Sequence, residues 1–366
     1  MLLDAKLREW ATRSATQPLT QPVPGESAVH YLGEVGFRKP GRRLAWRRCM
    51  LRLSGQEHLK AERFPAGAKR LLWIYFGENQ IGDALMDLAP RSLLAELGFE
   101  VDLFTSPEIA ALFEGDPWFR RVGSSPAEFD AAGYDCAIVL SNKDRPLRPK
   151  RQSFARMPWV SLHEFFTGPN FHRGLFAAQR LADLSGHRLT ADELQRHGLQ
   201  KLRPVAPADH HEGAPVPRIT LVAGGAHADR TYERWEAVIR ELVAAGETQV
   251  ALAGSANGSA DAARLVRALS GVARIDDFTG RMTLPQVRAL LDASQVVACP
   301  DGGLMHLALT TRAAVVPLFS AQIAPEWRLP TRTAYTALRS PTRRISDIAP
   351  HEVAAMILRS LRATRT

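Results

Sequence analysis

The 366-residue sequence contains only three cysteines and no long hydrophobic run. Cys49, Cys136 and Cys299 lie far apart, without the close spacing of a metal-binding set. Cys136 and Cys299 fall within apolar, strand-like runs, so we expect buried, reduced thiols rather than disulfides. No apolar run approaches the roughly 20 residues that cross a bilayer, and the N-terminus has no signal-peptide core. We therefore expect a cytoplasmic protein.

Motifs for several kinds of chemistry are also missing. No Gly-x-Gly-x-x-Gly follows the first predicted strand of either half, which argues against a nicotinamide-dependent dehydrogenase. No Asp-x-Asp pair ends a predicted strand and no His/Cys cluster is present, so we expect neither a required metal nor another cofactor. We find no nucleic-acid-binding motif and no aromatic stacking platform. The net charge of +9 then indicates another anionic partner, such as a phosphorylated sugar or a membrane surface.

The chain is long enough for two domains, and its predicted strands and helices alternate in two series. The second series follows a proline-rich stretch that is typical of a linker. This alternation predicts an α/β fold of two Rossmann-like, doubly wound domains. The expected parts are an N-terminal extension (1–66), a first Rossmann-like domain (67–202), a linker (203–217), a second Rossmann-like domain (218–345) and a C-terminal helix (346–366).

The extension contains a basic amphipathic segment at 42–53. One interpretation is a helix that lies on an anionic membrane. The other is a helix that packs on the main body through its apolar side chains, which are Leu44, Trp46, Met50 and Leu53. We favour packing, because lysine and arginine commonly cover the outer face of a core helix. The aromatic residues at 154–176 are likewise interpreted as packing rather than as the lining of an acceptor groove.

The most informative stretch is 296–307, where an apolar strand stops at Pro-Asp-Gly-Gly and a helical pattern begins at once. Two glycines let a backbone approach a ligand closely, and a helix start offers unpaired N–H groups. Asp301 can cap this helix, and His306 falls in its first turn. The pattern predicts a site for a phosphate-bearing ligand. The alternative is a capped turn with a surface histidine and no ligand.

Ligands of open parallel sheets bind beyond the carboxyl ends of the strands, which selects the loops 77–83, 224–230 and 300–306. The second and third belong to one domain and suit a diphosphate, with Arg230 or Arg234 adding positive charge. The first supplies Asp83 at the start of a helix, where a carboxylate stays ionised and can accept a proton. A first-turn charge that stabilises the helix is the alternative role for Asp83.

Three motifs together carry a family resemblance. They are Gly-Asp-Ala-Leu at 82–85, Thr-Gly-Arg-Met-Thr-Leu at 279–284 and Asp-Gly-Gly-Leu-Met-His-Leu-Ala at 301–308. In order and spacing, the chain resembles the bacterial heptosyltransferase family, glycosyltransferase family 9, over about 67–330. The resemblance implies a GT-B fold, in which two Rossmann-like domains face each other across a cleft. It also implies that the C-terminal domain holds the nucleotide-sugar donor and the N-terminal domain the acceptor.

The resemblance further implies residue roles. Asp83 matches the catalytic base. The residues that match or adjoin the family's donor site are Gly225, Ala226, Arg230, Arg234, Asp301, Gly302, Gly303, Leu304 and His306. The residues of the acceptor side of the cleft are Gly77, Asn79, Gln80 and Gly82. The family lysine two positions before Trp235 is Glu233 here, so Arg234 or Arg230 must substitute for it.

The implied function is an inverting, metal-independent transfer of a sugar, in many members heptose from ADP-heptose. The acceptor is a hydroxyl of a bacterial surface glycan, such as lipopolysaccharide core or capsule, or of its lipid-linked precursor. Peripheral contact with the inner face of the cytoplasmic membrane accompanies this interpretation. Two alternatives remain open: a GT-B enzyme with a soluble or protein acceptor, and a non-catalytic nucleotide-sugar-binding protein. The oligomeric state is not predicted.

Overall fold

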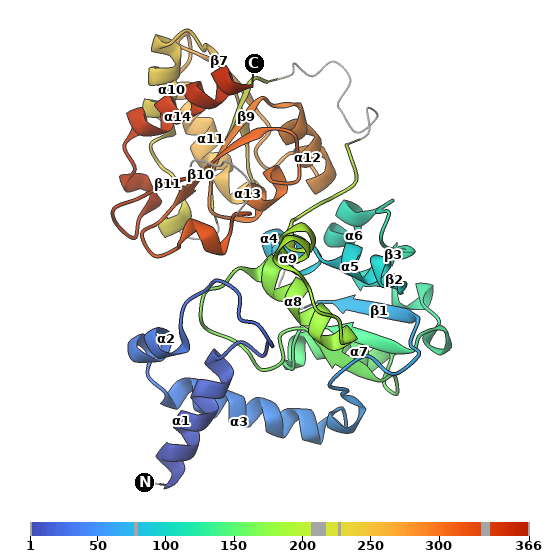
Figure 1. Cartoon of the computed structure of the whole chain (residues 1–366). Coiled ribbons are helices and arrows are strands. Elements are labelled where there is room, and N and C mark those ends of the chain that lie inside the picture. The colour runs from blue at the N-terminus through green and yellow to red at the C-terminus, as the bar shows by residue number, and fades with distance from the viewer. Residues whose placement is uncertain (1, 77–79, 206–216, 226–227, 331–336, 365–366) are drawn as a thin grey trace. The chain divides into compact units, whose positions relative to one another are not determined.

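The structure, a computed structural model, describes residues 2–76, 80–205, 217–225, 228–330 and 337–364. It divides into two compact units (Figure 1). Unit 1 comprises Met1–Arg203 with Glu326–Thr331, and unit 2 comprises Pro204–Pro325 with Arg332–Thr366. Most of the predicted linker, 206–216, lies outside the described residues.

Unit 1 contains a five-stranded parallel sheet in the order β3-β2-β1-β4-β5. Its strands are β1 (Arg70–Tyr75), β2 (Glu100–Thr105), β3 (Arg121–Gly123), β4 (Cys136–Val139) and β5 (Trp159–Ser161). The helices that follow them are α4 (Ile81–Asp87), α5 (Arg91–Glu96), α6 (Pro107–Phe113), α7 (Asp144–Ser153), α8 (Arg173–Ser185) and α9 (Ala191–Gly198). All residues of β1 from Leu71 to Tyr75 have no exposed surface, because helices cover both faces of a parallel sheet.

Unit 2 contains a six-stranded parallel sheet in the order β11-β10-β9-β6-β7-β8. Its strands are β6 (Ile219–Val222), β7 (Gln249–Ala253), β8 (Arg274–Asp277), β9 (Val296–Pro300), β10 (Ala314–Phe319) and β11 (Leu338–Arg339). Its helices are α10 (Trp235–Ala244), α11 (Ser259–Ala268), α12 (Leu284–Ala293), α13 (Gly303–Ala308) and α14 (Pro350–Ala363). The prediction of two Rossmann-like, doubly wound domains is therefore confirmed.

Both sheets have the same topological switch point. The first strand of each unit lies inside its sheet, and the chain then builds outward in one direction before crossing to the other side. The reversal falls between β1 and β4 in unit 1 and between β6 and β9 in unit 2. Loops diverge at such a point and leave a crevice beyond the carboxyl ends of the strands. The loop after β1 and the loops after β6 and β9 therefore begin where ligands of this fold class bind.

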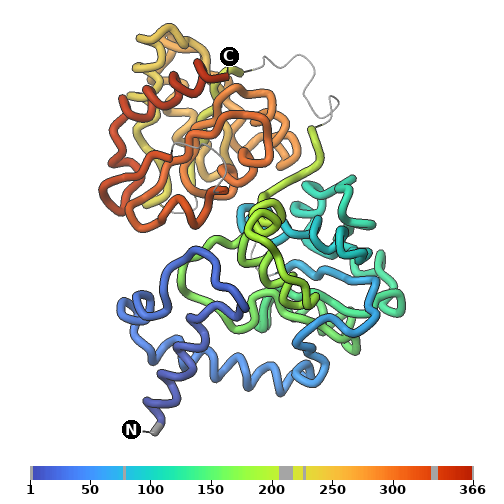
Figure 2. Tube along the Cα trace, viewed as in Figure 1, coloured from blue at the N-terminus to red at the C-terminus, as the bar shows by residue number. Residues whose placement is uncertain are grey.

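The N-terminal extension packs into unit 1 (Figure 2). It forms α1 (Leu2–Ala15), α2 (Ala28–Val35) and α3 (Arg38–Leu53). Helices α1 and α3 approach so closely at Gly41 that a Cβ atom there would lie 2.4 Å from the carbonyl oxygen of Leu7. Thr167 donates a backbone hydrogen bond of 2.8 Å to Ser14 at the end of α1. The extension is thus joined to the body of unit 1 through side chains and backbone.

The prediction of how α3 packs is only partly right. Leu44 and Leu51 are buried, whereas Trp46 is 66% exposed and Leu53 is 76% exposed. The geometry of the helix explains the error: Trp46 lies two residues after Leu44 and Leu53 two after Leu51, and two residues turn an α-helix by about 200°. The side chains of Trp46 and Leu53 therefore point away from the buried face, so the apolar residues of this segment do not all serve the core.

The predictions for the cysteines agree with the structure. All three thiols are free, and Cys136 and Cys299 are buried. Burial raises the pKa of the Cys136 thiol to about 12, so it stays protonated and unreactive. Of the aromatic residues at 154–176, Phe154, Trp159, Phe166 and Phe176 are buried in unit 1, whereas Phe165 and Phe171 are only partly buried. No helix among the described residues is long and apolar enough to cross a membrane.

Candidate functional site

The candidate base Asp83 lies in the first turn of α4, directly after the loop that follows β1. Its carboxylate Oδ2 is 3.1 Å from Nη1 of Arg173, and its side chain is 21% exposed. Arg173 is the first residue of α8, and α8 packs against α4. The helix cap is Gln80 rather than Asp83. The carboxylate is therefore held by a cation from a second helix while part of it remains accessible.

Arg173 is itself fixed by a buried polar network. Its Nε donates to Asp87 Oδ1 at 2.7 Å, and His163 Nε2 lies 2.9 Å from the same oxygen. The other oxygen of Asp87 accepts a hydrogen bond of 3.0 Å from the Tyr75 hydroxyl. Asp87 has no exposed surface. These contacts satisfy the buried carboxylate and hold Arg173 in one orientation beside Asp83.

The network sets the charge of its members. Burial alone raises the pKa of Asp87, but Arg173 and His163 outweigh it and bring that pKa to about 2. Burial lowers the pKa of Arg173, while Asp83 and Asp87 more than compensate and raise it well above its usual value. Burial also lowers the pKa of His163. At neutral pH, Asp87 is therefore ionised and His163 is neutral, so His163 donates its Nε2 proton to Asp87.

The structure describes only two of the four residues predicted for the acceptor side. Gly82 is buried in α4, and Gln80 is exposed at its start. Gly77 and Asn79 lie outside the described residues. Sequence reasoning did not find the network around Arg173. The spacing of Asp83 and Asp87, four residues apart on one helix, places both on one face and is a usable signal.

In unit 2, the loop after β6 is shaped by two glycines. Gly224 has φ +76°, and a Cβ atom there would lie 2.7 Å from Gly258 Cα. A Cβ atom on Gly225 would lie 2.7 Å from the Thr231 hydroxyl. Asn257, in the loop after β7, donates from Nδ2 to the Gly225 carbonyl at 2.7 Å. The loops after β6 and β7 are therefore packed backbone to backbone, and Asn257 is a further residue of this site that the sequence did not reveal.

Asp301 follows β9 and lies beside Arg230, which ends a short 3₁₀ turn, η5 (Ala228–Arg230). Arg230 Nη1 is 3.9 Å from Asp301 Oδ2, and Asp301 is 4% exposed. The N-cap position of α13 is Gly302, and Asp301 is the residue before it. The Asp301 N–H donates a hydrogen bond of 2.9 Å to the Leu318 carbonyl oxygen. This bond extends the pairing of β9 with β10.

Gly302 leaves open space in this loop. Its backbone is extended (φ 175°), which any residue can adopt, and the atom nearest to an added Cβ is the Pro300 carbonyl oxygen at 3.9 Å. Gly303 and Leu304 are partly exposed, whereas His306 is 3% exposed and not a surface histidine. Helix α13 has only six residues. It therefore offers backbone N–H groups rather than a long helix dipole.

Of the two arginines proposed to replace the family lysine, Arg230 is the one beside Asp301. Arg234 is exposed at the N-cap of α10, and no contact of the described residues joins it to Asp301 or His306. Ala226 lies outside the described residues. The structure therefore brings together Gly225, Arg230, Asp301 and Gly302, which follow the neighbouring strands β6 and β9.

The sequence model of glycosyltransferase family 9 (heptosyltransferase) matches residues 173–349. These residues form a family 9 domain. The match contains the loops after β6 and β9, and the predicted family resemblance and enzyme class, a glycosyltransferase, are confirmed. No curated protein sequence matches the chain.

Solved structures resemble this glycosyltransferase over most of its length. ADP-heptose lipopolysaccharide heptosyltransferase II of E. coli is 18% identical, with a TM-score of 0.59 over 81% of this chain and 100% of that one. A family 9 glycosyltransferase of Veillonella parvula is 13% identical, with a TM-score of 0.65 over 83% of this chain and 100% of that one. The iron-containing dodecameric glycosyltransferase TibC of enterotoxigenic E. coli is 14% identical, with a TM-score of 0.52 over 82% and 77%. These matches confirm the GT-B fold.

The family 9 match begins at Arg173, so it includes the partner of Asp83 but not Asp83 itself. The loops after β6 and β9 lie within the matched residues. The role of Asp83 depends on its place after β1 and on its contact with Arg173.

Proposed function

We propose that this glycosyltransferase transfers a heptose from ADP-heptose to a hydroxyl group of a bacterial surface glycan, such as lipopolysaccharide core or capsule. The observation that carries the proposal is the family 9 domain over 173–349, which includes both loops at the switch point of unit 2. The sugar and nucleotide follow from the family description and from the substrate named for the E. coli heptosyltransferase.

The donor diphosphate binds at the loops after β6 and β9. Backbone N–H groups at 302–304 and the guanidinium of Arg230 face the negative charge, and the open space at Gly302 lets the phosphates approach the backbone. Gly225, Ala226, Asp301 and His306 complete this donor site. Arg230 already lies beside Asp301 in the loop after β9. Arg234 contacts the diphosphate only if its side chain moves when the donor binds.

Asp83 acts as the base on the acceptor side, and Gly77, Asn79, Gln80 and Gly82 bind the acceptor. It takes the proton of the acceptor hydroxyl as that oxygen forms a bond to the anomeric carbon. The bond from the anomeric carbon to the donor phosphate breaks on the opposite face, and the electron pair leaves with the nucleoside diphosphate. Attack from the opposite face inverts the configuration.

Arg173 is a positioning residue in this scheme. Its guanidinium fixes the direction of the Asp83 carboxylate, because Arg173 is held by Asp87, which in turn contacts His163. When Asp83 accepts a proton, the positive charge of Arg173 remains balanced by Asp87. The network therefore tolerates the change of charge that catalysis requires.

The transfer requires no metal in this proposal, because backbone amides and Arg230 serve the leaving group. The described residues contain one group with metal-ligand spacing, which is formed by Glu26, just before α2, and by His30 and Glu34 of α2 in the extension. Treatment with EDTA followed by gel filtration tests the point. Unchanged turnover supports metal independence, and loss of turnover that Mg²⁺ or Fe²⁺ restores contradicts it.

The acceptor is presented at a membrane, and α3 is the contact surface. This helix carries seven lysine and arginine residues and no acidic residue, and Trp46 and Leu53 are exposed on one face of it. Of the six large hydrophobic residues exposed among the described ones, five belong to the extension: Leu3, Val29, Val35, Trp46 and Leu53. A basic helix with exposed apolar residues suits an anionic membrane surface.

The first test is a calorimetric titration of the purified protein with ADP, UDP, GDP, CMP and NAD. We expect ADP to bind at least tenfold more tightly than the others, and Arg230→Gln to weaken ADP binding about tenfold because a charge-assisted contact is lost. Arg240→Gln, an exposed arginine of α10, is the matched control. Tighter binding of another nucleotide would replace the proposed donor. Binding of ADP without any sugar transfer would favour a nucleotide-sugar-binding protein.

A further inference from the structure

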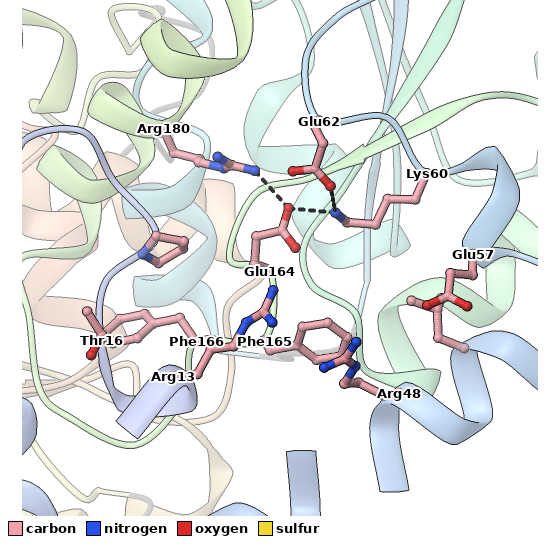
Figure 3. A pocket seen from close by; sticks show the side chains of 12 residues that line it. Arg13, Thr16, Arg48, Glu57, Lys60, Glu62, Glu164, Phe165, Phe166 and Arg180 are labelled. Atoms are coloured by element: carbon pink, nitrogen blue, oxygen red, sulfur yellow. Dashed lines mark hydrogen bonds and ion pairs between the residues drawn. The ribbon is translucent and has the colours of Figure 1, made fainter. Parts of the chain in front are cut away.

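Unit 1 contains a second polar pocket, formed where the extension meets the carboxyl end of β5 (Figure 3). Its volume is about 300 Å³. One side comes from α1 and α3, which contribute Arg13 and Arg48, and the other comes from 164–166 and Arg180 of α8. The pocket exists because the extension packs here, so it is separate from the donor loops of unit 2.

The acidic residues of the pocket are already neutralised. Glu164 Oε1 lies 2.8 Å from Arg180 and 2.9 Å from Lys60, and Lys60 also contacts Glu62 at 3.0 Å (Figure 3). Glu57 is paired with Arg52 at 2.9 Å. Each carboxylate at the pocket therefore has a cation of its own or shares one.

Two further arginines line the pocket outside these ion pairs: Arg48, and Arg13, whose charge adds to the hydrogen bond from Lys60 in lowering the pKa of Glu62. Among the residues that the structure describes, Arg13 and Arg48 form no ion pair and no side-chain hydrogen bond, and Figure 3 draws both side chains at the pocket. Arg13 is exposed and Arg48 partly exposed, so water or a ligand can reach them. The pocket thus carries an excess of positive charge beside two aromatic residues, Phe165 and Phe166.

The wall of the pocket is held in an unusual conformation. Glu164 has φ +52°, the only positive φ among the described non-glycine residues. Besides its two cations, its carboxylate accepts a hydrogen bond of 3.1 Å from Asn142, and its N–H donates to the Ser161 hydroxyl. A left-handed backbone is unfavourable at a non-glycine residue, and such residues cluster at ligand sites.

The pocket also lies near the candidate base. His163, which contacts Asp87 behind Arg173, immediately precedes Glu164. Strand β5 is two places from β1 in the sheet, which corresponds to about 10 Å. Both the pocket and Asp83 follow the carboxyl ends of their strands. An acceptor of more than one sugar can therefore reach both.

We propose that this pocket binds an anionic group of the acceptor glycan, a phosphate or a carboxylate, between Arg13 and Arg48. Lys60 and Arg180 hold Glu164 in place and shape the pocket wall. Assignment to the acceptor rests on the proposed function, whereas anion binding at this place does not. The extension then has a direct part in choosing the acceptor.

The test is a titration with two anions, inorganic phosphate and glucuronate, in a chloride-free buffer. Nuclear magnetic resonance of the arginine Nε–Hε groups reports binding at individual side chains. We expect saturable shifts of the Arg13 and Arg48 signals, and the anion that binds more tightly identifies the group. The variant Arg13→Gln/Arg48→Gln should bind at least tenfold more weakly, and Arg13→Lys/Arg48→Lys should stay within about threefold of the parent.

The matched control is Arg42→Gln/Arg43→Gln, which removes two exposed arginines of α3 that do not line the pocket. It should bind both anions within twofold of the parent. Non-saturable shifts with both anions, or equal binding by Arg13→Gln/Arg48→Gln, would overturn the proposal. ADP titration of the same samples tests the proposed function separately: loss of the pocket leaves ADP binding intact, and a failure to bind ADP leaves only the assignment to the acceptor without support.

Discussion

At the residue scale, the central feature is the Asp83 carboxylate, whose direction is fixed by a chain of buried polar contacts. Asp83 contacts Arg173, Arg173 contacts Asp87, and Asp87 is buried with His163 and Tyr75 around it. A helix-stabilising charge in a first turn needs no such support, because the helix N–H groups suffice. Burial of the Asp87 carboxylate is unfavourable by itself. Its presence here is explained if Asp83 must be held in one orientation.

Asp83→Asn is the variant that separates these roles. It preserves shape and removes the proton acceptor, so we expect the rate of sugar transfer to fall by about 10²–10⁴-fold. The affinity for the donor nucleotide should stay within about threefold, because the proposed nucleotide site lies in unit 2. Release of nucleoside diphosphate in the presence of a glycan acceptor measures the rate, and calorimetry measures the affinity.

Asp261→Asn is the control, because Asp261 also lies in the first turn of a helix and pairs with an arginine, at 3.0 Å, but its side chain is 49% exposed and, among the described residues, has no buried network behind it. It should leave transfer unchanged. A purely structural role for Asp83 predicts a different outcome, in which Asp83→Asn lowers the melting temperature and transfer and binding decline together.

A second residue-scale prediction concerns pH. His172 caps α8 by accepting the Leu175 N–H at 3.2 Å, and its Nε2 contacts the Leu329 carbonyl. Burial lowers its pKa to about 4. Between pH 6.5 and 4 the unfolded chain binds a proton that the folded chain does not, so stability falls as pH falls through this range. At pH 5 the loss is about 2 kcal/mol.

Urea denaturation at pH 7 and pH 5 measures this loss. His172→Asn keeps a helix cap and removes the titrating group, so the difference between the two pH values should shrink by about 2 kcal/mol. His58→Asn, at an exposed histidine of unit 1, should leave the difference unchanged. An unchanged difference in His172→Asn would exclude His172 as the source.

At the scale of elements, the proposed donor site consists mainly of loops. The loop after β6 is locked against the loop after β7, whereas the loop after β9 has room at Gly302. Glycines that the fold requires therefore differ from Gly302, which we propose is required for ligand binding. Gly224 belongs to the first kind, because of its φ of +76° and its contact with Gly258.

Gly302→Ala tests whether the diphosphate needs a glycine at this position. The added methyl group meets open space in an extended backbone, so the melting temperature should stay within about 2 °C of the parent. Affinity for ADP should fall at least tenfold if the diphosphate lies against this backbone. Gly33→Ala, another glycine with open space around it, is the control and should change neither. Unchanged ADP affinity in Gly302→Ala would place the diphosphate elsewhere.

At the scale of the whole molecule, the N-terminal extension adds two surface features to unit 1. Helices α1 and α3 complete one wall of a pocket in unit 1, and the outer face of α3 is basic with exposed Trp46 and Leu53. These two features use different side chains of the same helix. Acceptor selection and membrane contact can therefore be tested separately.

Trp46→Ala/Leu53→Ala should weaken binding to vesicles of phosphatidylcholine and phosphatidylglycerol by about tenfold or more, since two large apolar side chains no longer insert. Raising the salt concentration should weaken binding of the parent, because arginines of α3 attract the anionic lipid. Val272→Ala, at an exposed apolar residue of unit 2, is the control for vesicle sedimentation. Equal sedimentation of the double variant and the parent would exclude α3 as the membrane surface.

The sequence by itself determined the α/β class, the two series of strands, the loop after β9 and the family. These features are local: an apolar run of five residues, a Pro-Asp-Gly-Gly turn and a helical repeat are read within a short window, and parallel strands buried on both faces leave a continuous apolar pattern. The free thiols of Cys136 and Cys299 followed from the same runs.

Only the tertiary structure decided which side chains meet. Arg173 lies 90 positions after Asp83, and Arg48 meets residues that follow β5, so no local pattern connects them. The choice of Arg230 over Arg234 beside Asp301 depends on the 3₁₀ turn after β6. The exposure of Trp46 and the burial of His306 depend on which helix faces are covered. Periodicity predicts that a face is apolar, but only packing decides whether a neighbour covers it.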